Sequence, residues 1–187
     1  MNKILLTFAG CAALLVLSAC DTTSAIVPYT ASTPNMLALQ TKMRPIGGRL
    51  RVGDFAMASG VEKPGCRLVG QMDVTSGRPI EEYVKNALQT EIFTAQLYDV
   101  DGSVVISGQV DEVKVNTFGT GSWTLGLKVT SNRDPTGYHV ETVKRFGTSY
   151  IAEAACRNAS NAFAPAVQDL LGQVFSNPGF DKLAGRQ

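Results

Sequence analysis

The sequence predicts an α+β domain in which two helices cover one face of a mainly antiparallel sheet. Two stretches, at about 79–95 and 151–175, carry apolar residues at helical spacing. Between them lie three runs, at about 104–115, 123–130 and 138–150, in which apolar and polar residues alternate as along a half-buried strand. Two short apolar runs precede the first helix, so the predicted order of elements is β-β-α-β-β-β-α.

The first predicted strand begins near Arg49, where Leu50 and Val52 alternate with arginines. A second short strand is expected over 66–69, after a loop rich in glycine and proline. Pro79 suits the first turn of the following helix. The apolar face of this helix is formed by Ile80, Val84, Ala87, Leu88, Ile92 and Ala95.

The run that starts at Val104 loses its alternation at Asp111 and Glu112 and regains it at Val113. One extra residue in a strand predicts a β-bulge. The turn at 118–122 joins this run to the next, so the two should form a hairpin. The last helix contains Pro165, which should kink or restart it.

The N-terminus has the features of a bacterial lipoprotein precursor. Lys3 precedes an apolar segment at 4–16 that is too short to span a bilayer, and this indicates a signal peptide over residues 1–19. Leu17, Ser18, Ala19 and Cys20 match the lipobox. We therefore expect cleavage before Cys20 and attachment of acyl chains such as palmitate to its sulfur, since a thiolate is a good nucleophile at neutral pH.

The predicted domains after the signal peptide are a lipidated cysteine with a flexible tether at 20–45 and a single α+β periplasmic domain at 46–187. Scattered apolar residues and many Thr, Ser, Ala and Pro suggest the tether, although a short helix near 36–43 is possible. About 25 flexible residues would hold the domain roughly 25 to 30 Å from its anchor. The expected location is the cell envelope, facing the periplasm, and Asp21 leaves open which membrane holds the anchor.

Charge and cysteine content limit the possible partners. The mature chain would have 187 − 19 = 168 residues with 17 − 1 = 16 basic and 16 acidic side chains, a balance that disfavours nucleic-acid binding. Cys11 leaves with the signal peptide, so Cys66 and Cys156 remain beside the lipidated Cys20. In an oxidising compartment this pair suggests a disulfide, with two free thiols or a metal pair as the alternatives. Only His139 could add an imidazole, so metal is disfavoured.

The sequence offers no catalytic constellation. His139, the single histidine, is expected to face solvent on a strand, and no serine lies in a G-x-S-x-G elbow. We therefore predict a protein that is not an enzyme, with no catalytic residue, no metal site and no cofactor.

Several short motifs of the domain resemble a family of uncharacterised proteobacterial envelope lipoproteins, and more distantly the YajG-type lipoproteins. These motifs are Cys66-Arg67, the segment 77–99, the strand 104–110, Ser122-Trp123, Ser131-Asn132, Ala155-Cys156 and Asn177-Pro178-Gly179-Phe180. The resemblance implies a fold and a location in the cell envelope, and it implies no activity.

Two functions fit these expectations. One is a membrane-anchored module that docks an envelope protein, or presents an edge strand to it. The other is a small-ligand carrier or cryptic hydrolase. An exposed apolar patch or an open strand edge would favour docking, and a deep pocket with convergent polar groups would favour the carrier or hydrolase.

Overall fold

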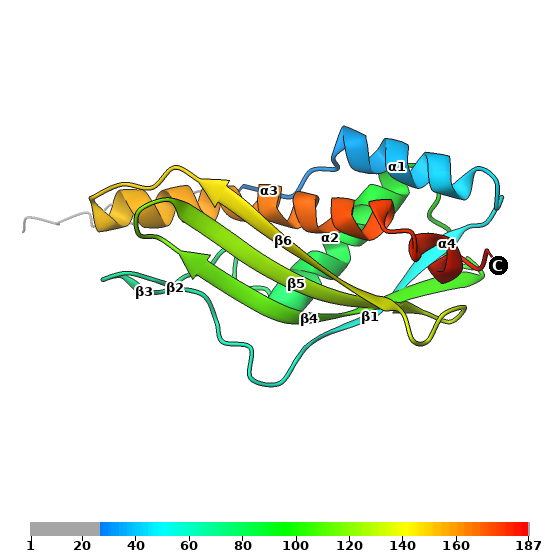
Figure 1. Ribbon diagram of the computed structural model, residues 1–187, viewed down its shortest axis with the longest axis horizontal. Coiled ribbons are helices and arrows are strands. Elements are labelled where there is room, and N and C mark those ends of the chain that lie inside the picture. The colour runs from blue at the N-terminus through cyan, green and yellow to red at the C-terminus, as the bar shows by residue number, and fades with distance from the viewer. Residues whose placement is uncertain (1–26, 187) are drawn as a thin grey trace, which may run out of the picture.

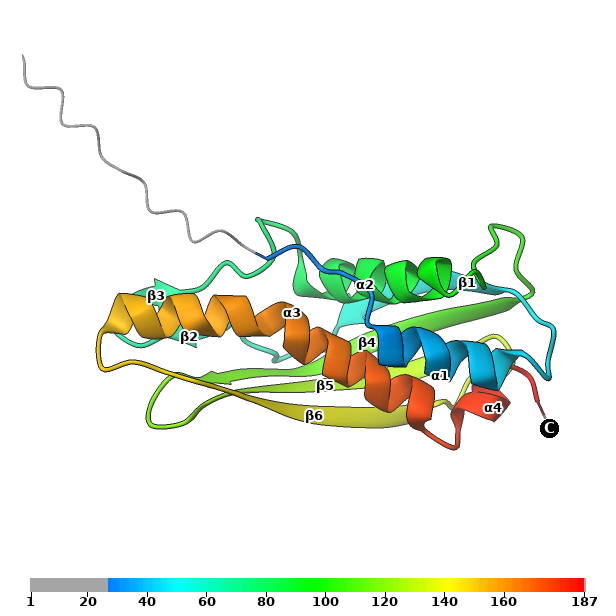
Figure 2. The same cartoon turned by 90° about the horizontal axis from the view of Figure 1, so that it is seen from above.

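The computed structural model describes residues 27–186, which form an α+β domain built on a four-stranded sheet (Figure 1). The order of strands across the sheet is β1 (Leu50–Met57), β4 (Val104–Asn116), β5 (Gly121–Ser131) and β6 (Tyr138–Phe146). Helices α2 (Ile80–Thr94) and α3 (Ala152–Ser176) cover one face of this sheet, as predicted (Figure 2).

The expected signal peptide and Cys20 lie outside the described residues. Within 27–186, no helix is both long and apolar enough to cross a bilayer.

The sheet is mixed. β4, β5 and β6 pair antiparallel, whereas β1 pairs with β4 in parallel, with Leu50 beside Val104 and Met57 beside Val110. The parallel pair follows from the chain order, because α2 lies between β1 and β4 and carries the chain back along the sheet. The predicted bulge is confirmed, since the β4–β5 register shifts between Val110 and Glu112.

The prediction of a second strand over 66–69 in this sheet is wrong. This segment forms a separate small hairpin of β2 (Gly65–Cys66) and β3 (Gly70–Gln71). The hairpin turns at Leu68, whose φ of 61° lies in the left-handed region that a strand residue does not adopt. An apolar run of this length can therefore be a hairpin tip as readily as a strand.

The core lies between the sheet and its two covering helices. Trp123 on β5 is fully buried against Phe163 of α3, with ring centroids 5.0 Å apart, and its indole N–H donates to the Ala159 carbonyl at 2.8 Å. α3 continues through Pro165, and its axis bends near the middle of the helix (Figure 2). A four-residue helix, α4 (Phe180–Leu183), closes the domain.

The short helix left possible near 36–43 is present, so the second half of the tether expected over 20–45 is part of the domain. Helix α1 (Thr33–Met43) packs on α2 and α3 on the side away from the sheet (Figure 1), and Leu39 and Met43 are buried there. The helix has a narrow apolar face with Asn35 as its other buried residue, so the sequence shows little helical periodicity. The segment between Cys20 and the first described residue, Val27, is correspondingly short.

Candidate functional site

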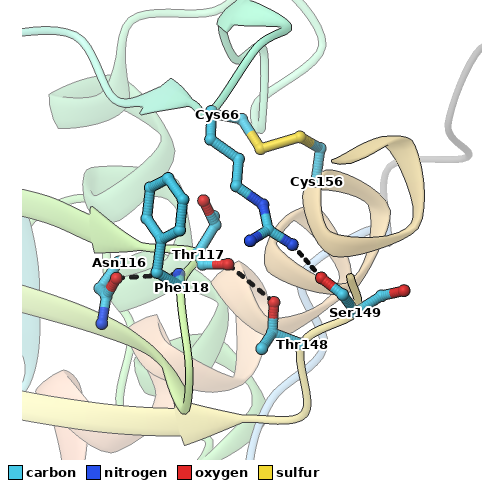
Figure 3. Close-up of a disulfide and its surroundings, with 8 residues drawn as sticks. Cys66, Asn116, Thr117, Phe118, Thr148, Ser149 and Cys156 are labelled. Atoms are coloured by element: carbon cyan, nitrogen blue, oxygen red, sulfur yellow. Dashed lines mark hydrogen bonds between the residues drawn. A yellow bond between two sulfur atoms is a disulfide. The ribbon is translucent and has the colours of Figure 1, made fainter. Parts of the chain in front are cut away.

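One end of the domain brings together three segments that are distant in the sequence. These are the β2–β3 hairpin, the turn between β4 and β5, and the segment 147–151 before α3. The predicted disulfide is present here: Cys66 of β2 is bonded to Cys156 of α3, with their Cα atoms 5.8 Å apart (Figure 3). The bridge ties the small hairpin to the first turns of the long helix.

Arg67 connects the three segments. Its guanidinium donates a hydrogen bond to the Ser149 carbonyl and lies 4.8 Å from the ring centroid of Phe118. A further bond runs from the Thr148 hydroxyl to the Thr117 carbonyl at 2.8 Å. The end of the domain is thus held by a covalent bond, a cation–π contact and hydrogen bonds, and its loops are not independent of one another.

This ordered end exposes a cluster of large apolar side chains. The side chain of Leu68 is 97% exposed, and Tyr150 is fully exposed. Monomeric soluble proteins rarely leave such groups clustered in water unless the surface binds something. We call this cluster the apolar tip, and it consists of Leu68, Val69, Phe118, Tyr150 and Ile151. This cluster was not predicted from the sequence, because Leu68, Val69 and Tyr150 fall in predicted strands and Ile151 falls in a predicted helix. Phe118 alone lies in a predicted turn.

A groove opens beside the tip, along the free edge of β4. The pairing with β1 ends at Val110, whose carbonyl accepts the amide of Ala58 at 2.8 Å, and the chain then leaves the sheet as the loop 59–65. Residues 112–116 continue as a strand that pairs with β5 alone among the described strands. The space between this edge and the loop has a volume of about 810 Å³. We call it the strand-edge groove, lined by residues 59–65, 111–116, Ser122 and Thr124.

Both walls of the strand-edge groove carry charges of both signs. Glu112 and Lys114 lie on the β4 wall, where their side chains form an ion pair at 2.7 Å, and Glu62 and Lys63 lie exposed on the loop. Lys114 is 77% exposed, and its pKa is raised by the hydrogen bond and the charge of Glu112. Alternation along β4 points these polar side chains to the open face, whereas Val113 faces the core and is buried.

His139 lies on the open face of the sheet, as predicted, and its polar partner is Asp111. The two side chains are 3.1 Å apart across Gly126, where an added Cβ would lie 2.5 Å from the Asp111 carboxylate. No hydroxyl or thiol of residues 27–186 forms a hydrogen bond with this imidazole. The described part of the chain also contains no group of three His, Cys, Asp or Glu side chains placed to hold a metal ion.

A fully buried carboxylate fastens the N-terminal segment to the domain. Glu91 of α2 accepts hydrogen bonds from the Tyr29 hydroxyl at 2.5 Å, the Ser32 amide at 3.0 Å and the Asn35 side-chain amide at 3.0 Å. The pKa of Tyr29 is raised above its ordinary value, mainly by burial of the hydroxyl and then by its hydrogen bond to Glu91 and the charge of that residue. This buried network was also not predicted, because Glu91 is unremarkable in the sequence of an amphipathic helix.

Comparisons with known proteins do not identify the family. No protein-family model matches the chain, and no curated protein matches it. One solved structure with a related outline is a Xanthomonas campestris protein described by the family model DUF330. It has 12% sequence identity and a TM-score of 0.46, with 68% of this chain and 84% of that chain covered. The resemblance to envelope lipoproteins therefore stays a prediction.

Proposed function

We propose that this protein is a membrane-anchored, non-enzymatic docking module of the bacterial cell envelope that binds an extended segment of a partner protein in the strand-edge groove. The observation that carries this proposal is the free edge of β4 over residues 112–116. A strand edge presents unpaired backbone amides and carbonyls, and adding a strand to it is a common mode of peptide recognition.

The groove has dimensions that suit such a segment. Five residues of strand, 112–116, span about 17 Å at about 3.4 Å per residue. The loop 59–65 stands opposite the edge, so a single extended chain fits more easily than the edge of another folded domain. Outward-facing Glu112 and Lys114 favour a partner segment with charged residues of both signs at alternate positions.

The alternative of a ligand carrier or hydrolase has weaker support. The strand-edge groove is an open trough lined by opposed charges, whereas small-molecule sites are enclosed and mainly apolar. The His139–Asp111 pair has no nucleophile hydrogen-bonded to it within residues 27–186. We therefore assign binding, and no reaction, to this face of the sheet.

The proposal predicts a specific pattern of photocrosslinking in living cells. A photoreactive phenylalanine analogue at Lys114 or Lys63, on the two walls of the groove, should give the same covalent adduct with one envelope protein. The matched control is Glu141, which is exposed on the same face but lies on β6, two strands from the free edge. It should give no such adduct.

Mass spectrometry of the adducts completes this test. Crosslinks from Lys114 and Lys63 should fall within one short segment of the partner, because both walls would enclose the same extended chain. The proposal is wrong if neither position gives an adduct in cells that contain the protein at its normal level, or if Glu141 gives the same adduct.

A further inference from the structure

We propose that the apolar tip inserts into the headgroup layer of the membrane that holds Cys20, so that α3 rises away from the bilayer with its first turn nearest the lipid. This inference goes beyond strand docking, and it rests on the lipid anchor of the proposed function.

The chemistry of the tip suits a lipid interface. Its five exposed side chains are aliphatic or aromatic, and they come from three segments that the disulfide and Arg67 hold in one place. Leucine, phenylalanine and tyrosine favour the boundary between headgroups and acyl chains. Because the segments are fixed to one another, the apolar surface is already assembled before it meets a membrane.

The charges around the tip favour an anionic membrane surface. The segments 65–71, 116–122 and 145–157 contain three basic residues, Arg67, Arg145 and Arg157, against one acidic residue, Glu153. Each basic residue near an anionic leaflet contributes favourably to binding. The domain as a whole has nearly equal numbers of acidic and basic residues, so this excess is a local property of the tip.

The reach of the anchor is consistent with the same orientation. The chain from Cys20 to Val27 spans at most about 25 Å when fully extended. Thr30 is fixed beside α3, where the Gln168 side chain donates to its carbonyl at 2.8 Å. From Ala152 to Gln168 the helix rises about 24 Å at 1.5 Å per residue. From α1 the described chain runs back toward the tip (Figures 1 and 2), so a short anchor can hold the tip at the bilayer.

Depth-dependent fluorescence quenching tests this placement. The lipidated full-length chain is reconstituted into vesicles of phosphatidylglycerol and acyl-brominated phosphatidylcholine, carrying either Tyr150→Trp or Phe93→Trp. Phe93 is the matched control, because it is 68% exposed and lies near the end of α2, away from the tip. The wild-type chain, with Trp123 as its single tryptophan, supplies the baseline.

In the brominated vesicles, the emission of Tyr150→Trp above the wild-type Trp123 baseline should fall at least twofold and shift to the blue. The corresponding emission of Phe93→Trp should stay unchanged. Adding Leu68→Glu to Tyr150→Trp should abolish most of the quenching.

Equal quenching at both positions, or none at Tyr150→Trp, overturns the placement. A blue shift of Tyr150→Trp emission that grows with protein concentration in vesicle-free solution also overturns the placement, because it would show that the tip binds a second copy of the chain. Flotation with the vesicles reports the lipid anchor separately, and its failure overturns the placement too.

Discussion

Replacing both Cys66 and Cys156 by serine should lower the free energy of unfolding by about 2 to 4 kcal/mol. The bridge closes a loop with a sequence separation of 90 residues. The chain-entropy model gives about 4.6 kcal/mol for a loop of that size, and measured bridges often contribute less. This is a large part of the 5 to 15 kcal/mol that stabilises a typical domain.

Equilibrium unfolding in urea measures this loss. The wild-type chain treated with a reducing agent is the matched control, and it should lose about as much stability as the double variant does. Amide exchange should accelerate most at the β2–β3 hairpin, which the bridge fastens to α3. A loss below about 0.5 kcal/mol, the range of ordinary surface substitutions, would show that the bridge does not support the fold.

Glu91→Ala should destabilise the domain by about 3 kcal/mol, with the damage centred on the N-terminal segment. The substitution removes the acceptor for three donors, those of Tyr29, Ser32 and Asn35. A buried donor left without a partner costs about 1 to 3 kcal/mol, and the three losses overlap because the groups belong to one network.

Amide exchange and urea unfolding together test the prediction for Glu91. Residues 29–43 should lose protection in Glu91→Ala while β4 and β5 keep theirs, because α1 packs mainly on α2 and α3. Glu82→Ala, an exposed position on the same helix, is the control and should change stability by less than about 0.5 kcal/mol. Unchanged protection of α1 in Glu91→Ala would mean that the carboxylate does not fasten the segment.

The elements with a strong local period could be predicted from the sequence. The helix at 80–94 follows from apolar residues at helical spacing, and the β4–β5 hairpin and the bulge near Asp111 follow from alternation and its interruption. These patterns depend only on residues that are close in the sequence. The cysteine pair could be predicted because the number of cysteines left few alternatives. The prediction of a mainly antiparallel sheet with helices on one face is also confirmed, because it was built from these locally patterned elements.

The features that matter most for binding depend on contacts between distant residues. The free edge of β4 exists because β1 ends beside Val110, and no local pattern reveals which strand pairs with which. The tip likewise requires the β2–β3 hairpin and the segment 147–151, which are distant in the sequence, to be held together. From the sequence, helix α1 could be predicted only as a possible short helix near 36–43, because its attachment uses a buried carboxylate on α2 in addition to its own narrow apolar face.

The proposed insertion of the apolar tip into lipid depends on attachment of the chain to a membrane through Cys20. Intact-mass and N-terminal peptide analysis of protein isolated from its native membrane tests this attachment most directly. We expect a mature chain that begins at Cys20 and carries a diacylglycerol on that residue, and a Cys20→Ser chain that keeps its first 19 residues. A mature chain that begins at another residue, or an unmodified Cys20, would contradict it.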